Sequence, residues 1–198
     1  MEWIWPTLAR FSIVISLIID TSTVRTTVAL CRDYELLFTR HHDGATEHAE
    51  ILPTLVREAL VQSQNIDQVV VGMGPGPFTG LRVGIAFAQS FAHARSLPCH
   101  GVCSLDGIDI DSDDYIVASD ARRKEVYWAR YKNGHRIDGP FVSTPNQVIE
   151  LQARKFGFGF TETLFPSPHL LLAKSRTSEI NAPMYLRRPD AIPTNERQ

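Results

Sequence analysis

The chain has 198 residues, of which 43% are hydrophobic, and its 20 basic and 22 acidic side chains give a net charge of −2. This composition is typical of a globular protein, and the length predicts one or two domains with a core large enough to fold without a disulfide or a metal. The near-neutral charge argues against a broad basic face for nucleic acid, because neutralising phosphates needs clustered Lys and Arg. Any contact with RNA is therefore expected to be shared with a partner.

The cysteines and the N-terminal segment both indicate a cytoplasmic protein. Cys31, Cys99 and Cys103 are an odd number without disulfide spacing, so all three are predicted to be free thiols. The apolar run at residues 13–19 lacks the basic segment and the cleavage site of a signal peptide, and it is too short to span a bilayer. Residues 1–12 are interpreted as an extension that precedes the first strand. No contact with a membrane is expected.

The first half of the chain predicts the element order β-β-β-α-β-α-β. The opening run is apolar and β-branched without alternation, which is typical of a central strand covered on both faces. Apolar residues then alternate in two short stretches and later recur at helical spacing in two longer ones. The expected strands are residues 13–19, 26–30, 36–39, 69–71 and 98–102, and the expected helices are residues 46–60 and 79–93.

An acidic stretch at residues 109–114 is interpreted as the boundary between two lobes. An N-terminal lobe is expected over residues 13–108 and a C-terminal lobe over residues 115–191. The pattern weakens after residue 145. Expected there are a helix at residues 147–153, a turn at 157–159, an apolar stretch at 170–173 and an unstructured tail at 193–198.

The start of the second lobe repeats the start of the first. The strand at residues 115–119 ends in Asp120, as the strand at 13–19 ends in Asp20, and residues 126–131 alternate as a hairpin partner. A strand that ends in Asp and is followed by a hairpin, used twice, is the layout of the actin-like ATPase and sugar kinase superfamily (ASKHA, RNase H-like). We therefore expect a two-lobed α/β fold.

A glycine-rich loop, Gly72–Gly80, precedes the second helix. Glycines before a helix N-terminus let backbone amides approach a phosphate. However, Leu81 follows where a P-loop has lysine, and Pro75 and Pro77 lack the amide hydrogen that a phosphate would bind. A structural turn that sets the direction of the next helix is favoured over a phosphate site.

The second helix carries small residues every fourth position. Such a face lets another element approach closely, and a glycine inside a helix, which costs about 1 kcal/mol relative to alanine, needs a packing reason. Because the helix is apolar nearly all round, we expect one face on the sheet and another against a second helical surface. The small residues are Gly80, Gly84, Ala88 and Ala92, flanked by Val83, Phe87 and Phe91.

No metal site is predicted. A helical metal pair that included His48 would need its second ligand at position 52, which is Leu52. The aspartates within residues 109–114 lack the glycine that a calcium loop needs at its sixth position, and Cys99 and Cys103 lack the second pair of a zinc site.

Two loops are candidates for a nucleotide cleft. In nucleotide-binding relatives the loop after the first strand holds a glycine that admits phosphate, but here Ser22 stands in its place. The equivalent loop after the second-lobe strand is charged, and a solvated turn explains it equally well. The candidate cleft residues are Asp20, Thr21, Ser22, Asp120 and Arg122.

Five stretches together resemble one family closely, namely TsaB (also called YeaZ), which acts in threonylcarbamoyladenosine synthesis on tRNA. The most specific stretch is the Gly-Pro-Gly-Pro-Phe-Thr-Gly-Leu-Arg run, and the resemblance extends from about residue 13 to residue 191. The stretches are residues 18–22, 48–53, 74–84, 120–127 and 185–189.

The resemblance implies a non-catalytic scaffold that dimerises with the transferase TsaD and stabilises it. In the family TsaD carries a His-x-x-x-His metal pair and modifies the tRNA, an ATPase, TsaE, completes the set, and TsaB meets tRNA only through the complex. The resemblance also implies pairing through the two helices of the N-terminal lobe. Family members self-associate through the same helices, and whether this chain does so without its partner is left open. The implied interface residues are His48, Ile51, Leu55, Phe78, Thr79, Gly80, Arg82, Val83, Gly84, Phe87 and Ala88.

Some features leave alternatives open. Between Phe160 and Pro183 the chain is short for a complete second lobe, so a reduced C-terminal lobe is expected. The rival functions are an ATP-dependent phosphotransferase or ATPase that uses the Asp20 and Asp120 loops, and a metallopeptidase-like protein. No cofactor is expected for the chain alone, and a nucleotide at the joint interface with the partner is left open.

Overall fold

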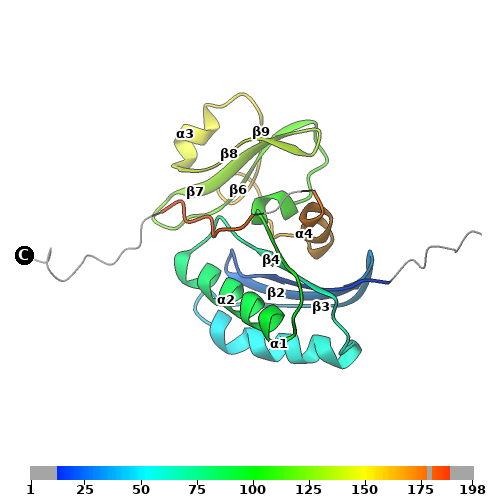
Figure 1. The fold of residues 1–198 in the computed structure, drawn as a ribbon. Helices are drawn as coiled ribbons and strands as arrows, with labels where there is room; N and C mark the ends of the chain where they lie inside the picture. Colours follow the sequence, from blue (N-terminus) through cyan, green and yellow to red (C-terminus); the bar gives the residue numbers. More distant parts are fainter. Residues whose placement is uncertain (1–12, 178–179, 188–198) are drawn as a thin grey trace, which may run out of the picture.

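The computed structural model describes residues 13–177 and 180–187, which form two lobes, drawn one above the other in Figure 1. Each lobe is built on one β-sheet. The first sheet has five strands in the order β3-β2-β1-β4-β5, and the second has four in the order β8-β7-β6-β9. The predicted extension at residues 1–12 and the predicted tail at residues 193–198 lie outside the described residues.

The N-terminal sheet combines an antiparallel meander with two parallel strands. The meander pairs β1 (Ile15–Asp20) with β2 (Arg25–Arg32) and β2 with β3 (Glu35–Asp43). On its other side β1 pairs in parallel with β4 (Gln68–Gly72), which pairs with β5 (Cys99–Val102). The predicted order of elements is confirmed, although β3 extends four residues beyond the predicted end.

Helices cover both faces of the N-terminal sheet (Figure 1). Helices α1 (His48–Gln62) and α2 (Phe78–Ala94) pack on one face, where Leu17 and Ile19 of β1 are fully buried. The short helix α4 (Pro168–Ser175) packs on the other face and buries Leu171 and Leu172 against Ile18. All six residues of β1 are buried, so the prediction of a central strand covered on both faces is confirmed.

The C-terminal sheet repeats the first four strands of the N-terminal sheet. An antiparallel meander of β6 (Asp114–Asp120), β7 (Val126–Lys132) and β8 (His135–Ser143) is extended by β9 (Arg154–Gly157), which is parallel to β6. A five-residue helix, α3 (Pro145–Ile149), takes the place of α1, and the described residues hold no counterpart of α2 or β5. This confirms the actin-like fold with a reduced C-terminal lobe.

Helix α4 follows the C-terminal sheet in sequence but packs against the N-terminal lobe. Helix α4, the 3-10 turn η1 (Ser104–Gly107) beneath it, and the N-terminal sheet are in contact, although the sequence placed residues 115–191 in the C-terminal lobe. The reason is that the face of the sheet opposite α1 and α2 is apolar and needs a cover, which Leu171 and Leu172 provide.

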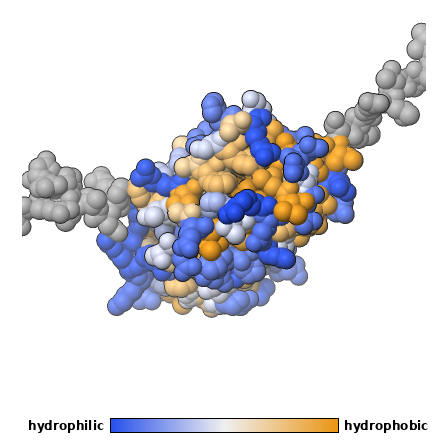
Figure 2. Space-filling view, turned by 90° about the horizontal axis from the view of Figure 1, so that it is seen from below, coloured by the Kyte–Doolittle hydropathy of each residue, from blue (hydrophilic) through white to orange (hydrophobic). Residues whose placement is uncertain are grey.

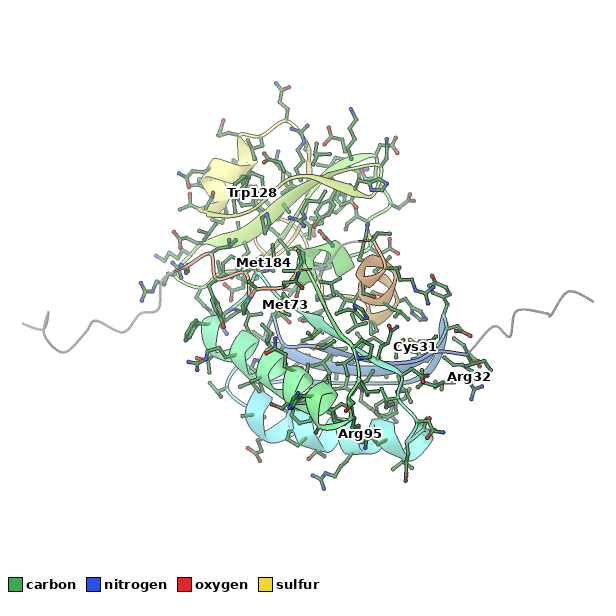
Figure 3. The ribbon with its side chains drawn as sticks, viewed as in Figure 1. Cys31, Arg32, Met73, Arg95, Trp128 and Met184 are labelled. Atoms are coloured by element: carbon green, nitrogen blue, oxygen red, sulfur yellow. The ribbon has the colours of Figure 1, made fainter. Side chains whose placement is uncertain are left out.

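The segment at residues 180–187 runs across both lobes. The backbone amides of Ile180 and Met184 donate to the carbonyls of Gly101 (2.9 Å) and Met73 (2.8 Å). Figure 3 shows Met184 beside Met73 at the junction of the lobes. Further on, the Arg187 guanidinium donates to the carbonyl of Ala121 (2.8 Å) and pairs with Glu125 in the C-terminal lobe. This segment therefore fastens one lobe to the other.

Cys31, Cys99 and Cys103 are free thiols, and burial raises the pKa of Cys31 to about 11. Within residues 13–177 and 180–187, no helix has both the length and the apolar character needed to cross a membrane.

Candidate functional site

Helices α1 and α2 lie side by side on the sheet and leave one long face turned outward (Figure 1). The inward positions of α2, including Leu81, Ile85 and Ala92, belong to the core of the N-terminal lobe. On the underside of the molecule, where the two helices lie, Figure 2 shows hydrophobic surface bordered by hydrophilic side chains. This outward face is the first candidate site.

The small-residue face of α2 is filled by the protein itself. A Cβ at Gly84 would lie 2.2 Å from Thr21 Oγ1, and one at Gly80 would lie 2.8 Å from the Thr21 carbonyl oxygen. Thr21 Oγ1 also donates a hydrogen bond of 2.8 Å to the Gly80 carbonyl, and Ala88 is fully buried. Within the chain, this face therefore contacts the loop after β1 and, at Gly80, also His48 of α1. The glycines are needed because the loop after β1 packs against the helix there.

The helix α1 residues are divided between core and surface. His48 is 4% exposed, and its Nδ1 lies 2.7 Å from Thr26 Oγ1, so it bonds within the core rather than facing a partner. Burial is the main cause that lowers the pKa of His48 and favours its neutral form. Leu52 and Leu55 are also buried, whereas Ile51 is half-buried at the edge of the outward face.

The accessible part of the predicted interface lies mainly on one stripe of α2. Val83, Phe87 and Phe91 occupy successive turns and are half-buried, and the rings of Phe87 and Phe91 stack at 6.3 Å. Arg82 lies over the Phe78 ring at 5.2 Å. Six of the predicted residues are at least partly accessible: Ile51, Phe78, Thr79, Arg82, Val83 and Phe87. Tyr185, whose ring lies 4.9 Å from that of Phe78, extends this stripe and was missed from the sequence.

The Asp20 carboxylate is sealed inside the N-terminal lobe. It accepts hydrogen bonds from the Ser22 amide (3.0 Å), Ser22 Oγ (2.8 Å) and Ser104 Oγ (2.7 Å). A Cβ at Gly72 would lie only 1.9 Å from Asp20 Oδ2. Burial is the main cause that raises the pKa of Asp20. The carboxyl group is thus enclosed by its neighbours.

The predicted nucleotide cleft is not assembled. Asp20, Thr21 and Ser22 are 2%, 1% and 2% exposed, so they offer no surface to a phosphate or a cation. Of the five predicted cleft residues, only Asp120 and Arg122 line a cavity. The correction has a physical reason: the Ser22 hydroxyl, in place of glycine, satisfies the Asp20 carboxylate from within the chain.

A cavity of about 90 Å³ lies between the lobes. Asp120 Oδ1 at its mouth accepts from the Arg122 amide at 2.7 Å, and Arg122 pairs with Asp120 Oδ2 at 3.3 Å. The volume is well below the 300–1,000 Å³ of typical sites for larger ligands. The lining residues are Thr23, Val24, Pro77, Ser119, Asp120, Arg122, Phe158, Thr163, Leu164 and Phe165. Of these residues, the sequence analysis named Asp120 and Arg122 as candidates. It missed the others because they come from chain segments that meet only in the folded protein.

The possible metal ligands do not converge. Across the two described stretches, no three His, Cys, Asp or Glu side chains are grouped so that they could hold a metal ion. The aspartates before β6 form the connection between the lobes, and Cys103 is buried with a pKa raised to about 12, chiefly by desolvation.

Comparisons with known proteins agree with this architecture. The family model for TsaD, tRNA N6-adenosine threonylcarbamoyltransferase, matches residues 42–164. An uncharacterized protein of Mycobacterium tuberculosis is 41% identical over 206 aligned residues, which cover 94% of this chain and 98% of the relative. A solved protein from Pseudomonas aeruginosa with similarity to peptidase YEAZ superposes with a TM-score of 0.72 at 24% identity, covering 88% of this chain and 100% of that chain. The fold and these matches define a two-lobed, actin-like protein.

More distant relatives carry a functional name. The tRNA threonylcarbamoyladenosine biosynthesis protein TsaB of Escherichia coli is 35% identical over 127 residues, which cover 59% of this chain and 54% of that protein. TsaB of Bacillus subtilis is 30% identical, with 60% and 56% covered. The chain thus spans about half the length of the relatives named TsaB. The chain belongs to the TsaB (YeaZ) family, within the broader group that the TsaD model describes.

Proposed function

We propose that the chain is a non-catalytic subunit in the synthesis of N6-threonylcarbamoyladenosine on tRNA, and that it dimerises with a TsaD-type transferase and stabilises it. The names of the TsaB relatives and the match to the transferase model support the pathway. The observation that carries the non-catalytic role is on α1. Leu52 stands in the core where a helical metal pair would need a second histidine, and His48 is bonded to Thr26.

The two rival functions find no support in the site. A phosphotransferase or ATPase would need Asp20 open to a nucleotide and its cation, but this carboxyl group is enclosed by Ser22, Ser104 and Gly72. A metallopeptidase-like protein would need a cluster of ligands, and none lies among the described residues.

The proposed partner surface is the outward face of α1 and α2. Its apolar stripe of Val83, Phe87 and Phe91 is only half-buried within the chain, and a pair of helices from the partner would complete its burial by helix-on-helix packing. Arg82 and Thr79 are exposed beside the stripe and supply a polar rim. Gly80, Gly84 and Ala88 act indirectly, because they hold α2 against the loop after β1.

The same surface is proposed to form the homodimer when the partner is absent. Without the partner, two copies can pair through the same apolar stripe, since a two-fold interface needs one self-complementary patch. A TsaE-type ATPase and the tRNA are proposed to join through the complex. A net charge of −2 is in keeping with a subunit that does not hold RNA by itself.

Size-exclusion chromatography with light scattering tests the proposal. The chain is run alone and mixed with the TsaD-type protein of the same organism, and a 1:1 heterodimer is expected to replace any homodimer. Phe87→Glu places a charge in the stripe and is expected to weaken the heterodimer at least a hundredfold, the size of a hot-spot loss. Ile137→Glu is the matched control, because Ile137 is 55% exposed on β8 of the other lobe.

Gly84→Leu is unsuitable for this test. Its side chain would collide with Thr21 inside the same chain, so a lost heterodimer would reflect a damaged fold. If Phe87→Glu and Val83→Glu both fold and bind like the unmodified chain, the proposed surface is wrong. If the folded chain forms no complex at all, the scaffold role itself is wrong.

A further inference from the structure

The cavity between the lobes has an apolar wall and a polar end. Phe158, Leu164 and Phe165 of the C-terminal half form the wall, and Val24 and Pro77 of the N-terminal lobe lie across from it. Ser119, Asp120 and Arg122 from the end of β6 supply the polar groups. A mostly apolar pocket with a few converging polar groups is the usual form of a small-ligand site.

Ser119 carries the strongest indication of a ligand. The residue is 5% exposed and lines the cavity, and its Oγ has no hydrogen-bond partner in the part of the chain that the structure describes. Buried hydroxyl groups are nearly always bonded, because burying one without a partner is unfavourable. It is the one buried side-chain polar atom of the described residues that lacks a partner, and it belongs to a residue that lines this cavity.

Opposite charges stand at the same end of the cavity. The Asp120 carboxylate and the Arg122 guanidinium touch at 3.3 Å, and this contact leaves other donors of the guanidinium for a ligand. An anion alone would be repelled by Asp120, and a cation alone would be repelled by Arg122. A ligand with both charges close together satisfies both side chains.

The volume limits the size of the ligand. One water needs about 10–15 Å³ of such space, so a cavity of about 90 Å³ accommodates roughly six to nine non-hydrogen atoms. This size fits a short α-amino acid.

Contacts between the lobes hold the wall in place. The Arg25 guanidinium lies 3.8 Å from the centre of the Phe165 ring, and the same group makes two hydrogen bonds, of 2.6 and 2.8 Å, to Asp43. A cation fixed by a carboxylate and stacked on an aromatic ring restrains that ring. The wall is therefore formed before a ligand arrives, which lowers the cost of binding.

We propose that this cavity binds an α-amino acid with a short, uncharged side chain. The ligand carboxylate accepts hydrogen bonds from Ser119 Oγ and from the Arg122 guanidinium. The ligand ammonium donates to the Asp120 carboxylate, and the side chain lies against Phe158, Leu164 and Phe165. The proposal is independent of the partner surface on α1 and α2.

Isothermal titration calorimetry of the whole chain tests the proposal. The probes are glycine, L-alanine, L-serine, L-threonine and L-valine, each titrated separately at millimolar concentration. At least one L-amino acid is expected to bind saturably at one site. The half-molecules propionate and ethylamine are expected to bind at least tenfold more weakly, because each of them lacks one of the two charged groups. The D-enantiomer is also expected to bind at least tenfold more weakly, because with both charged groups in place its side chain points away from the apolar wall.

Variants separate a ligand site from a structural cavity. Ser119→Ala removes the unpartnered hydroxyl, so it is expected to raise the melting temperature of the empty protein and to weaken amino-acid binding about tenfold. Leu164→Trp fills the cavity and is expected to abolish binding in a protein that still unfolds cooperatively. Ser90→Ala is the matched control, since Ser90 is exposed on α2 and away from the cavity lining.

The proposal would be overturned by the absence of saturable binding for every probe, by equal binding of the two enantiomers, or by unchanged binding to both Ser119→Ala and Leu164→Trp. Tighter binding of ATP or ADP than of any amino acid at this cavity would also overturn it. Heterodimer formation is measured separately on the same protein, so a failure here and a failure of the scaffold role are distinguished.

Discussion

The loops that follow β1 and β6 occupy equivalent positions in the two repeats but have opposite characters. After β1, Asp20 is buried and its carboxylate is bonded by Ser22 and Ser104. After β6, Asp120 stays partly exposed, pairs with Arg122 and borders a cavity. The carboxylate at the end of the strand is therefore part of the core in the first lobe and partly accessible in the second. Position within a repeat therefore does not decide the role of the carboxylate, which depends on the groups that contact it.

The largest effect is expected from opening the sealed loop. A Cβ at Gly72 would lie 1.9 Å from Asp20 Oδ2 and 2.5 Å from Ser104 Oγ, both fixed by their mutual hydrogen bond. Gly72→Ala is therefore expected to lower the free energy of unfolding by about 3–5 kcal/mol, since it both overpacks the core and breaks a buried polar network. Urea denaturation measures the loss.

The control for this variant is a glycine with open surroundings. Gly134 lies in the β7–β8 turn at φ +72°, and nothing approaches a Cβ there within 4 Å. Gly134→Asn is expected to change the free energy of unfolding by less than about 1 kcal/mol, because Asn tolerates the left-handed region. A Gly72→Ala protein as stable as Gly134→Asn would show that the Asp20 network is not tightly closed.

The next effect concerns pH. Burial raises the pKa of Asp20, so the folded protein holds this proton more tightly than the unfolded chain does. The contribution of Asp20 to stability is therefore complete below the unfolded pKa of about 3.9 and falls as pH rises from there through the folded pKa. Asp20→Asn cannot ionise, so its stability relative to the unmodified chain is expected to increase with pH over this window.

Denaturation curves of the two proteins at matched pH values provide the measurement. Asp43 and Asp114 have pKa values lowered by their arginine partners, so their contributions to stability change with pH in the opposite direction to that of Asp20. Both proteins contain these two residues, so subtracting one free energy of unfolding from the other cancels their contributions. A difference that is constant with pH, or that decreases as pH rises, would contradict a sealed Asp20.

The smallest effect is expected at the equivalent carboxylate of the second repeat. Asp120 pairs with Arg122, whose side chain is 48% exposed, so water screens the pair. Asp120→Asn is expected to cost about 0–1 kcal/mol of unfolding free energy, and less at high salt. Thermal unfolding at low and high salt checks this. A cost as large as that of Gly72→Ala would reverse the comparison between the loops.

The sequence predicted the local patterns well because their causes are local. The uninterrupted apolar run of β1 indicated a strand buried on both faces, and the strand ending in Asp120 revealed the internal repeat. Strand β8 was missed because it is half-exposed, lies at the sheet edge and contains Gly139 and Pro140, which are uncommon within strands.

The candidate site was only partly predictable. The four-residue spacing of Gly80 and Gly84 correctly indicated a close approach to α2, but it could not show that Thr21 of the same chain makes this approach. The cavity residues Ser119, Leu164 and Phe165 carry no shared sequence pattern, since they converge only when the two lobes meet. Contacts between distant segments depend on how the chain packs in three dimensions. The spacing of residues along one segment carries no information about that packing.

Light scattering after size-exclusion chromatography, applied to the chain mixed with the TsaD-type protein of the same organism, decides whether the chain is a scaffold subunit. We expect a 1:1 heterodimer that the unmodified chain and Ile137→Glu form equally and that Phe87→Glu loses. A folded chain that elutes separately from the transferase, or a Phe87→Glu variant that binds as tightly as Ile137→Glu, would contradict the scaffold role or its surface, respectively.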